Sequence, residues 1–307
     1  MFTTLSGQPV SRFSFGCMQF GGGAEEEESK AMYAACREAG ISFFDTAYGY
    51  TEGRSETFLG RCVASERADV FVATKCAYTG AAPDAIAAQI EESLRRLNID
   101  VIDLLYLHRW DENVPLEETL QALAKTVGAG KVRYIGVSNF AAWQVMKAQH
   151  MAANMGFRIS ALQPMYNLVK RQVEVELLPM AVSEDIAVCP YSPLGGGLLT
   201  GKYQNGGDGR LVQDKRYAAR YALPWMAEAA AGLVGVAEEL GVSPSVLAVA
   251  WVAKNPAVYG PIISARSVAQ LRPSLDAMAY EIDDALYARL SALSPTPPPA
   301  TDRIEEA

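Results

Sequence analysis

Four side chains capable of acid–base chemistry follow three successive apolar runs of the sequence. Asp45 lies in the first run with Tyr50 just beyond it, Lys75 ends the second run, and His108 ends the third. If the runs are neighbouring parallel strands, their carboxyl ends meet at one rim and bring these groups together. An ammonium beside a phenol favours the phenolate and lowers a pKa that is ordinarily about 10. Such a pair suits proton transfer near neutral pH.

Each of these residues also has an ordinary structural interpretation. An Asp before a turn is often a cap, a loop Tyr is often a surface residue, and a strand-end Lys is usually solvated. A lone His is more often a satisfied polar residue than a catalyst. The coincidence at matching strand ends favours a shared site, in which Asp45 would supply the counter-ion that a buried Lys75 needs.

The segments that must position these residues alternate between short apolar runs and longer helical patterns. Most of the runs are continuously apolar, which is typical of strands buried on both faces of a parallel sheet. Helical periodicity with matching end signals is clear in 25–39, 83–97 and 116–127. The eight predicted strands are 12–16, 42–47, 70–75, 101–108, 132–139, 159–166, 186–193 and 258–264.

Eight strands with intervening helices form either a closed barrel or a doubly wound open sheet. No GxGxxG follows the first predicted strand, so the barrel is favoured. We therefore predict an α/β fold, a (β/α)8 TIM barrel, with an N-terminal β-hairpin over 1–11 and a long Gly-rich loop at 195–225 after strand seven. Residues 1–293 would form this single domain, and the Pro-rich tail 294–307 would be extended.

Composition excludes several classes of function. The chain of 307 residues carries a net charge of −8, which argues against nucleic acid as its main partner. Five scattered cysteines without a CxxC motif indicate reduced thiols. The sequence contains no HxH or HExxH spacing, so we predict no metal site. We find no signal peptide and no apolar stretch of membrane-spanning length. We expect a cytoplasmic protein, monomeric or a small homo-oligomer, whose partner is a small molecule.

The ordered motifs FDTAYGY, ATK, LHRW, IGVSNF, LQPMYN and YSPLGGGLLTGKY resemble the aldo-keto reductase superfamily across roughly residues 5–290. The resemblance implies an oxidoreductase that moves hydride between a nicotinamide cofactor and a small carbonyl or aldose-type substrate. It makes Tyr50 the general acid or base, tuned by Lys75 and Asp45, with His108 aligning the substrate oxygen. The LHRWD form is similar to bacterial members that act on sugars, inositols or small aldehydes, which indicates carbohydrate metabolism.

The resemblance also implies a cofactor pocket. Ser138, Asn139 and Gln163 would hold the nicotinamide carboxamide, and Tyr191 would stack on its ring. Glycines after strand seven would let backbone amides approach a pyrophosphate. The predicted cofactor-binding residues are Gly16, Cys17, Met18, Asp45, Ser138, Asn139, Gln163, Tyr191, Ser192, Leu194, Gly195, Gly196, Gly197, Lys202, Ser264, Arg266, Gln270 and Ser274.

At the adenosine end the chain departs from many relatives. Ser264 and Ala265 stand where a Lys-Ser pair is common, and Arg266 could replace the lost charge, since a guanidinium suits a phosphate. We therefore favour NADP(H) over NAD(H), with NAD(H) use possible. Besides Met18, the predicted substrate contacts are Gln19, Phe20, Tyr48, Tyr50, His108, Arg109 and Trp110, together with part of the loop 195–225.

Some alternatives stay open from the sequence. Arg109 could bind an anionic substituent or pair with Asp111 or Glu112. The chain could be a sugar or polyol dehydrogenase running oxidatively, or a cofactor-binding regulatory subunit with little catalysis. An unrelated barrel lyase or isomerase would instead use Lys75 to form a Schiff base.

Overall fold

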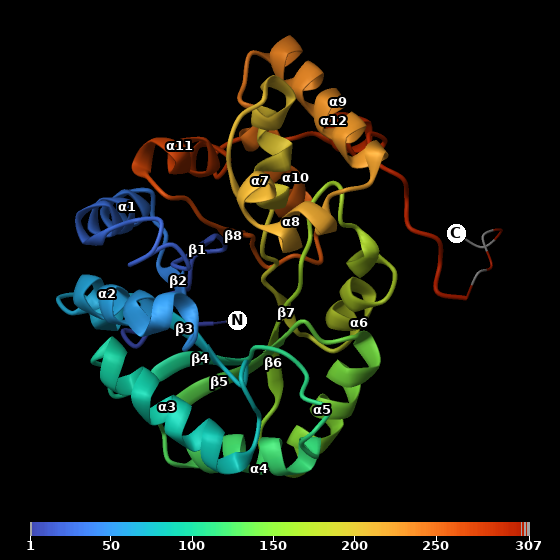
Figure 1. The fold of residues 1–307 in the computed structure, drawn as a ribbon. Coiled ribbons are helices and arrows are strands. Elements are labelled where there is room, and N and C mark those ends of the chain that lie inside the picture. The colour runs from blue at the N-terminus through green and yellow to red at the C-terminus, as the bar shows by residue number, and fades with distance from the viewer. Residues whose placement is uncertain (1, 302, 304, 306–307) are drawn as a thin grey trace.

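A closed ring of eight parallel strands organises the molecule (Figure 1), in a computed structural model that describes residues 2–301, 303 and 305. The strands pair in the order β7-β6-β5-β4-β3-β2-β1-β8. Backbone N–H groups of Tyr259 and Ile262 donate to the carbonyls of Val188 and Pro190 at 2.8 and 2.9 Å, and close the ring. The strands are β1 (Ser14–Gly16), β2 (Phe43–Asp45), β3 (Phe71–Cys76), β4 (Ile102–Leu107), β5 (Val132–Ser138), β6 (Ile159–Gln163), β7 (Ala187–Val188) and β8 (Ile262–Ile263).

The predicted (β/α)8 barrel is confirmed, and each predicted run overlaps one strand, with β3 ending one residue beyond its run. The runs for β7 and β8 are much shorter as strands than the sequence suggested, with two residues each. Pro190 follows β7 closely and Pro261 precedes β8 directly. Proline has no backbone N–H to donate to a strand ladder, so pairing stops beside it.

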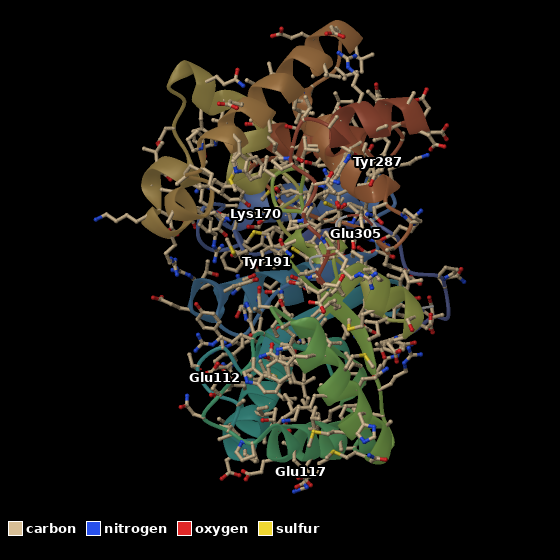
Figure 2. All side chains as sticks on the ribbon, turned by 90° about the vertical axis from the view of Figure 1, so that its right-hand side faces the viewer. Glu112, Glu117, Lys170, Tyr191, Tyr287 and Glu305 are labelled. Atoms are coloured by element: carbon tan, nitrogen blue, oxygen red, sulfur yellow. The ribbon has the colours of Figure 1, made fainter. Side chains whose placement is uncertain are left out.

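Helices form an outer ring around the strands, and charged side chains such as Glu117 point away from it (Figures 1 and 2). The helices predicted at 25–39, 83–97 and 116–127 correspond to α1, α3 and α4. The helices of the ring are α1 (Glu26–Glu38), α2 (Arg54–Val63), α3 (Pro83–Leu97), α4 (Leu116–Gly128), α5 (Ala142–Asn154), α6 (Leu177–Ser183), α9 (Pro224–Leu240), α10 (Pro244–Lys254), α11 (Val268–Asp276) and α12 (Asp284–Ser291).

The N-terminal segment is a hairpin that plugs the barrel floor, as predicted; Met1 lies outside the described residues. Thr3 bridges Pro9 in antiparallel fashion. The Phe2 ring lies 5.3 Å from that of Phe71 and 4.9 Å from that of Tyr134. This aromatic contact seals the end of the barrel opposite the carboxyl ends of the strands.

The long connection after β7 contains short helices that the sequence did not reveal. These are η4 (Gly195–Thr200), η5 (Lys202–Asn205), α7 (Arg210–Gln213) and α8 (Lys215–Arg220). Gly196 and Gly197 adopt φ of 66° and 95°, so the chain reverses between turns in a conformation that favours glycine. Helices α7 and α8 lie beside the strand ends, inward of α9 and α12 (Figure 1).

The remaining predictions about the chain ends and about membranes are answered only in part. In the predicted tail 294–307, residues 295–299 form neither helix nor strand, and 302, 304 and 306–307 lie outside the described residues. Among the described helices, none is by itself long and apolar enough to cross a membrane. The pair α9 and α10, bent by 103°, meets the same criteria of length and composition when taken together.

Candidate active site

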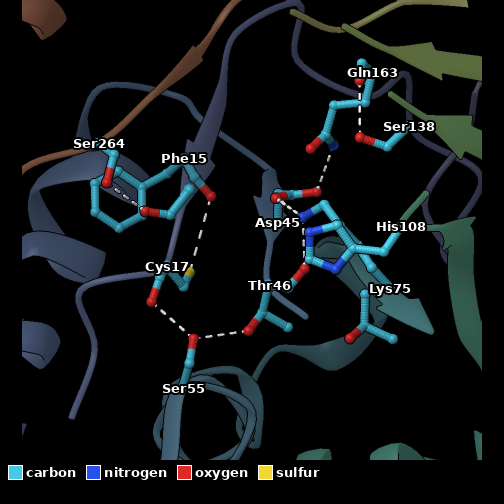
Figure 3. Close-up of polar contacts among 12 residues, drawn as sticks. Phe15, Cys17, Asp45, Thr46, Ser55, Lys75, His108, Ser138, Gln163 and Ser264 are labelled. Atoms are coloured by element: carbon cyan, nitrogen blue, oxygen red, sulfur yellow. Dashed lines mark hydrogen bonds and ion pairs between the residues drawn. The ribbon is translucent and has the colours of Figure 1, made fainter. Parts of the chain in front are cut away.

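A buried ion pair lies at the carboxyl ends of β2 and β3. Lys75 is 1% exposed and Asp45 is 3% exposed. The Lys75 ammonium donates to Asp45 Oδ1 and, at 2.7 Å, to the Thr46 carbonyl. Gln163, at the end of β6, donates from Nε2 to Asp45 Oδ2 at 2.9 Å (Figure 3). Both carboxylate oxygens are therefore occupied, as burial of a charge requires.

The phenol and the imidazole lie above this pair. Tyr50 begins the short helix η1 (Tyr50–Gly53), and Lys75 Nζ lies 5.0 Å from the centroid of its ring. The ring of His108 is 5.8 Å from that of Tyr50 and nearly perpendicular to it, at 84°. The structure thus brings together the four residues that the sequence placed at one rim.

Burial and charge set the proton affinity of each group. Burial opposes the charge on Lys75, but Asp45 and Tyr50 outweigh it and raise the pKa of Lys75. Burial raises the pKa of Tyr50, and the Lys75 charge opposes that rise without reversing it. The sequence-based expectation of a lowered Tyr50 pKa was therefore wrong in net direction. Burial, with help from Lys75 and Arg109, lowers the pKa of His108 to about 3, so the imidazole is neutral.

The loop that carries Tyr50 is fixed by a second buried pair beneath it. Arg96 of α3 donates to the Tyr48 carbonyl at 2.9 Å, and its guanidinium lies 4.5 Å from the Tyr48 ring. The buried carboxylate of Glu56 accepts from Arg96 at 3.3 Å and from Thr74 at 2.7 Å. Thr74 is the neighbour of Lys75 in β3, so this pair ties the Tyr50 loop to the strand that holds the ammonium.

A chain of hydroxyl groups supports the other side of the loop (Figure 3). Ser55 donates from its hydroxyl to the Cys17 carbonyl at 2.7 Å, and its oxygen lies 2.7 Å from Thr46 Oγ1. The Cys17 amide donates to the Asp45 carbonyl at 2.7 Å. Cys17 is fully buried, so its part in the site is to support the neighbouring backbone.

A cavity of about 1060 Å³ opens above the ion pair. Asp45, Tyr50 and His108 line it, whereas Lys75 lies behind them. Of the predicted cofactor residues, all line it except Cys17 and Gly195. The others that do are Gly16, Met18, Ser138, Asn139, Gln163, Tyr191, Ser192, Leu194, Gly196, Gly197, Lys202, Ser264, Arg266, Gln270 and Ser274.

The predicted substrate contacts divide into two groups. Gln19 and Arg109 line the cavity together with Tyr50 and His108. The other three, Phe20, Tyr48 and Trp110, are not part of its lining. Phe20 packs inside the barrel against Phe15, with ring centroids 5.6 Å apart. Tyr48 stacks on Arg96, and Trp110 packs against Phe140 with centroids 5.4 Å apart.

Polar side chains are held in place at the ends of β5, β6 and β7. Tyr191 donates from its hydroxyl to Asn139 Oδ1 at 2.7 Å, and Asn139 Nδ2 donates to the His108 carbonyl at 2.9 Å. Ser138 donates to the Gln163 carbonyl at 2.8 Å. Asn139 adopts φ of 57°, a sparsely populated conformation for a non-glycine residue that often marks a functional position.

Sequence reasoning missed several side chains that line the cavity. Tyr78, which follows β3, lies 4.9 Å from the His108 ring. The others lie on or near α7 and α8, within the loop 195–225, part of which was predicted to line the site without its residues being named. They include Arg210, Asp214, Arg216, Tyr217 and Arg220.

Known proteins resemble the chain along most of its length. The aldo/keto reductase family matches residues 12–295. A "Probable voltage-gated potassium channel subunit beta" from Arabidopsis thaliana is 34% identical over 89% of both chains. "Uncharacterized oxidoreductase YrpG" from Bacillus subtilis (strain 168) is 33% identical over 95% of this chain and 94% of its own. "Aflatoxin B1 aldehyde reductase member 2" from Rattus norvegicus is 38% identical over 65% of this chain and 57% of its own.

Proposed function

The chain belongs to the aldo/keto reductase family, and from that premise we propose that Tyr50 is the proton donor when NADP(H) reduces a small carbonyl compound. The family carries out carbonyl reduction with nicotinamide cofactors. The observation that carries the proposal is the buried Lys75–Asp45 pair beneath a phenol that lines a cavity beside a neutral imidazole.

Each residue around the carbonyl would have its own task. When bound, reduced nicotinamide supplies a hydride to the carbonyl carbon. Tyr50 gives its proton to the carbonyl oxygen, so one C=O π bond is replaced by a C–H and an O–H bond. His108 is neutral and donates an N–H hydrogen bond to that oxygen. Lys75 stabilises the phenolate that Tyr50 becomes after it gives up its proton, and Asp45 keeps Lys75 charged.

The protonation state of Tyr50 suits the reductive step, and the same residue would act as the base if the reaction ran oxidatively. Burial raises the pKa of Tyr50, so the phenol keeps its proton at neutral pH and is ready to act as an acid. An oxidative sugar or polyol dehydrogenase would need the phenolate as a base. The Schiff-base alternative is disfavoured, because Lys75 is charged, buried and outside the cavity lining.

The cavity residues fit a dinucleotide in the order of its chemical groups. The amide side chains of Asn139 and Gln163 lie at the catalytic end and offer donors and acceptors to a carboxamide. Lys202 lies against Gly197, in the segment proposed for the pyrophosphate. Arg266 lies beside Gly23 and is proposed for the 2′-phosphate, which favours NADP(H). A cytoplasmic aldose or aldehyde reductase is the form of this function that we propose.

The test is Tyr50→Phe, which keeps the ring and removes the acid. We expect kcat for glyceraldehyde with NADPH to fall at least about a hundredfold, while the Kd of NADPH, measured by its fluorescence, stays near the native value. Tyr280→Phe is the matched control, because Tyr280 lies near Phe13 at the opposite end of the barrel. If Tyr50→Phe keeps native turnover, Tyr50 is not the proton donor.

A regulatory subunit with little catalysis is the second candidate, favoured by the similarity to proteins named as potassium channel beta subunits. A carbonyl reductase and a regulatory subunit would both bind the cofactor, but they would differ in the rate at which they reduce aldehydes. Reduction of simple aldehydes by the native protein at about 1 s⁻¹ or faster, within the ordinary range for enzymes, would favour the enzyme. NADPH binding without such turnover would favour the regulatory subunit.

A further inference from the structure

Positive charge is concentrated in the cavity of an otherwise acidic chain. The net charge of the chain is −8. The cavity lining nevertheless contains six basic and three acidic side chains, and one of the acidic ones, Asp45, is neutralised by Lys75. The basic residues are Arg109, Lys202, Arg210, Arg216, Arg220 and Arg266.

These cations fall into groups along the cavity. Arg266 lies beside Gly23, at the end assigned to adenosine. Lys202 lies against Gly197, in the segment assigned to the pyrophosphate. The cofactor phosphates account for the charges at these two places. Arg109 and Arg220 lie elsewhere, at the end where the cofactor carries a neutral or cationic nicotinamide.

Arg109 is joined to the catalytic imidazole through one aromatic ring. Its guanidinium lies 4.9 Å from the Tyr78 ring, and that ring lies 4.9 Å from the His108 ring. Within the described residues Arg109 forms no ion pair. The nearby Asp111 carboxylate instead accepts from the backbone amides of Ala81 and Asn113, both at 3.0 Å. The sequence-based alternative of an Arg109–Asp111 salt bridge is therefore not formed.

Arg220, the last residue of α8, lines the same cavity. Its guanidinium lies 4.9 Å from the Tyr217 ring. Burial raises the pKa of Tyr191, which follows β7, to about 12, and the positive charge of Arg220 opposes that rise. Arg220, like Arg109, has no carboxylate partner in the part of the chain that the structure describes. Arg216 differs, because it is paired with Asp214 at 3.2 Å. Arg210 differs as well, because it donates to the Tyr217 hydroxyl at 3.1 Å.

Resting on the carbonyl reduction proposed above, we propose that the substrate bears an anionic group, a carboxylate or a phosphate, which Arg109 and Arg220 bind. Guanidinium groups form charge-assisted hydrogen bonds with both kinds of anion. The reacting carbonyl would lie between Tyr50 and His108, with the anion toward the part of the cavity lined by the two arginines. This narrows the substrate class from small carbonyls to aldehydes or ketones that carry an acid.

The experiment compares anionic and neutral aldehydes of matched length. The carboxylate arm pairs 4-oxobutanoate with butanal, and the phosphate arm pairs glyceraldehyde 3-phosphate with glyceraldehyde. In each arm the ratio of the two kcat/KM values is the readout. We expect native ratios above one, falling about tenfold in the double variant Arg109→Gln/Arg220→Gln, as for a lost hydrogen bond to a charged group.

A binding measurement and a control complete the design. Calorimetric titration of the NADP⁺-loaded protein with succinate or inorganic phosphate should show weaker binding to the double variant. Raising the KCl concentration should shrink the native preference, because exposed charges are screened. Lys147→Gln removes an exposed cation of α5 that is outside the cavity lining and should leave both ratios unchanged.

The outcomes separate this inference from the proposed function. The arm with the larger loss identifies the anion as carboxylate or phosphate. Reduction of neutral aldehydes at equal or higher efficiency than anionic ones would overturn the anion site and leave the carbonyl reductase standing. A native preference that survives both substitutions would overturn the assignment to Arg109 and Arg220. Failure to reduce any of the four aldehydes would overturn both proposals.

Discussion

Asp45→Asn tests the electrostatic basis of the site. The substitution removes the carboxylate charge next to Lys75 and keeps the shape of the side chain. Both residues are almost fully buried, and Lys75 lies outside the cavity lining, so solvent screens the ammonium little. Removing one member of a buried pair costs about 3–5 kcal/mol, because the other charge stays buried and unpaired. We expect the free energy of unfolding at pH 7 to fall by about that amount.

The pH dependence of this loss identifies Lys75 as its source. In the native protein Asp45 and Tyr50 outweigh burial and raise the pKa of Lys75. Its contribution is therefore fully present below the unfolded pKa of about 10.4 and is lost as pH rises through the higher folded value. In Asp45→Asn burial prevails, and the folded pKa falls below the unfolded one. The unfolded state then binds more protons, so stability increases with pH by up to about 1.4 kcal/mol per pH unit.

The assay is urea unfolding followed by tryptophan fluorescence, at steps from about pH 7 to about pH 10, below the pKa of unfolded Lys. The quantity of interest is the variant-minus-native difference, in which groups far from the site cancel. It should shrink as pH rises. Asp103→Asn is the matched control: Asp103 is fully buried and paired with Arg67 at 2.7 Å and Arg133 at 2.6 Å. Guanidinium groups do not titrate here, so its loss should be constant with pH.

Comparing the stability losses of Asp45→Asn and Asp103→Asn as functions of pH shows whether Asp45 keeps Lys75 charged. A loss in Asp45→Asn that is as flat with pH as that of Asp103→Asn would mean that Lys75 keeps its proton without Asp45. The argument that Asp45 maintains the ammonium beneath Tyr50 would then be refuted. A full restoration of stability at high pH would support it, since neutral Lys75 needs no counter-ion.

Two further predictions concern the ends of the barrel. Arg266→Ala should raise the Kd of NADP⁺ about tenfold more than that of NAD⁺, as for a lost hydrogen bond to a charged group; equal weakening in fluorescence titrations would remove Arg266 from the 2′-phosphate site. Phe2→Ala should lower the free energy of unfolding by about 3–5 kcal/mol, because Phe2 is buried among aromatic rings. The kcat of this variant should stay native, and a matching fall in kcat would show that the floor influences the site.

The barrel and the four clustered residues could be predicted because one rule connects sequence to position. Parallel strands in a closed barrel end at one rim, so polar residues that follow apolar runs must lie near one another. Asp45, Lys75 and His108 follow this rule directly. Tyr50 requires more, because its loop passes through Thr51 and Glu52 at φ of 48° and 59°, a conformation that no sequence signal announced.

Predictions failed where a side chain's neighbours come from distant segments. Phe20, Tyr48 and Trp110 are close in sequence to lining residues, and proximity suggested that they would share the cavity. Each instead meets a partner from another element: Phe15, Arg96 and Phe140 respectively. Which face of a loop points inward depends on such partners, and a single sequence does not identify them.

The direction in which the pKa of Tyr50 shifts depends most clearly on partners from distant segments. Considering only the neighbouring ammonium predicts a lowered pKa, but burial outweighs the ammonium and raises the pKa of Tyr50. Part of the protein around Tyr50 comes from the connection after β7, since Tyr217 of α8 is close enough to influence its pKa. Tyr217 in turn rests against Gly196. The readiness of the phenol to give up its proton is therefore set jointly by the predictable strand ends and by the segment whose fold the sequence revealed least.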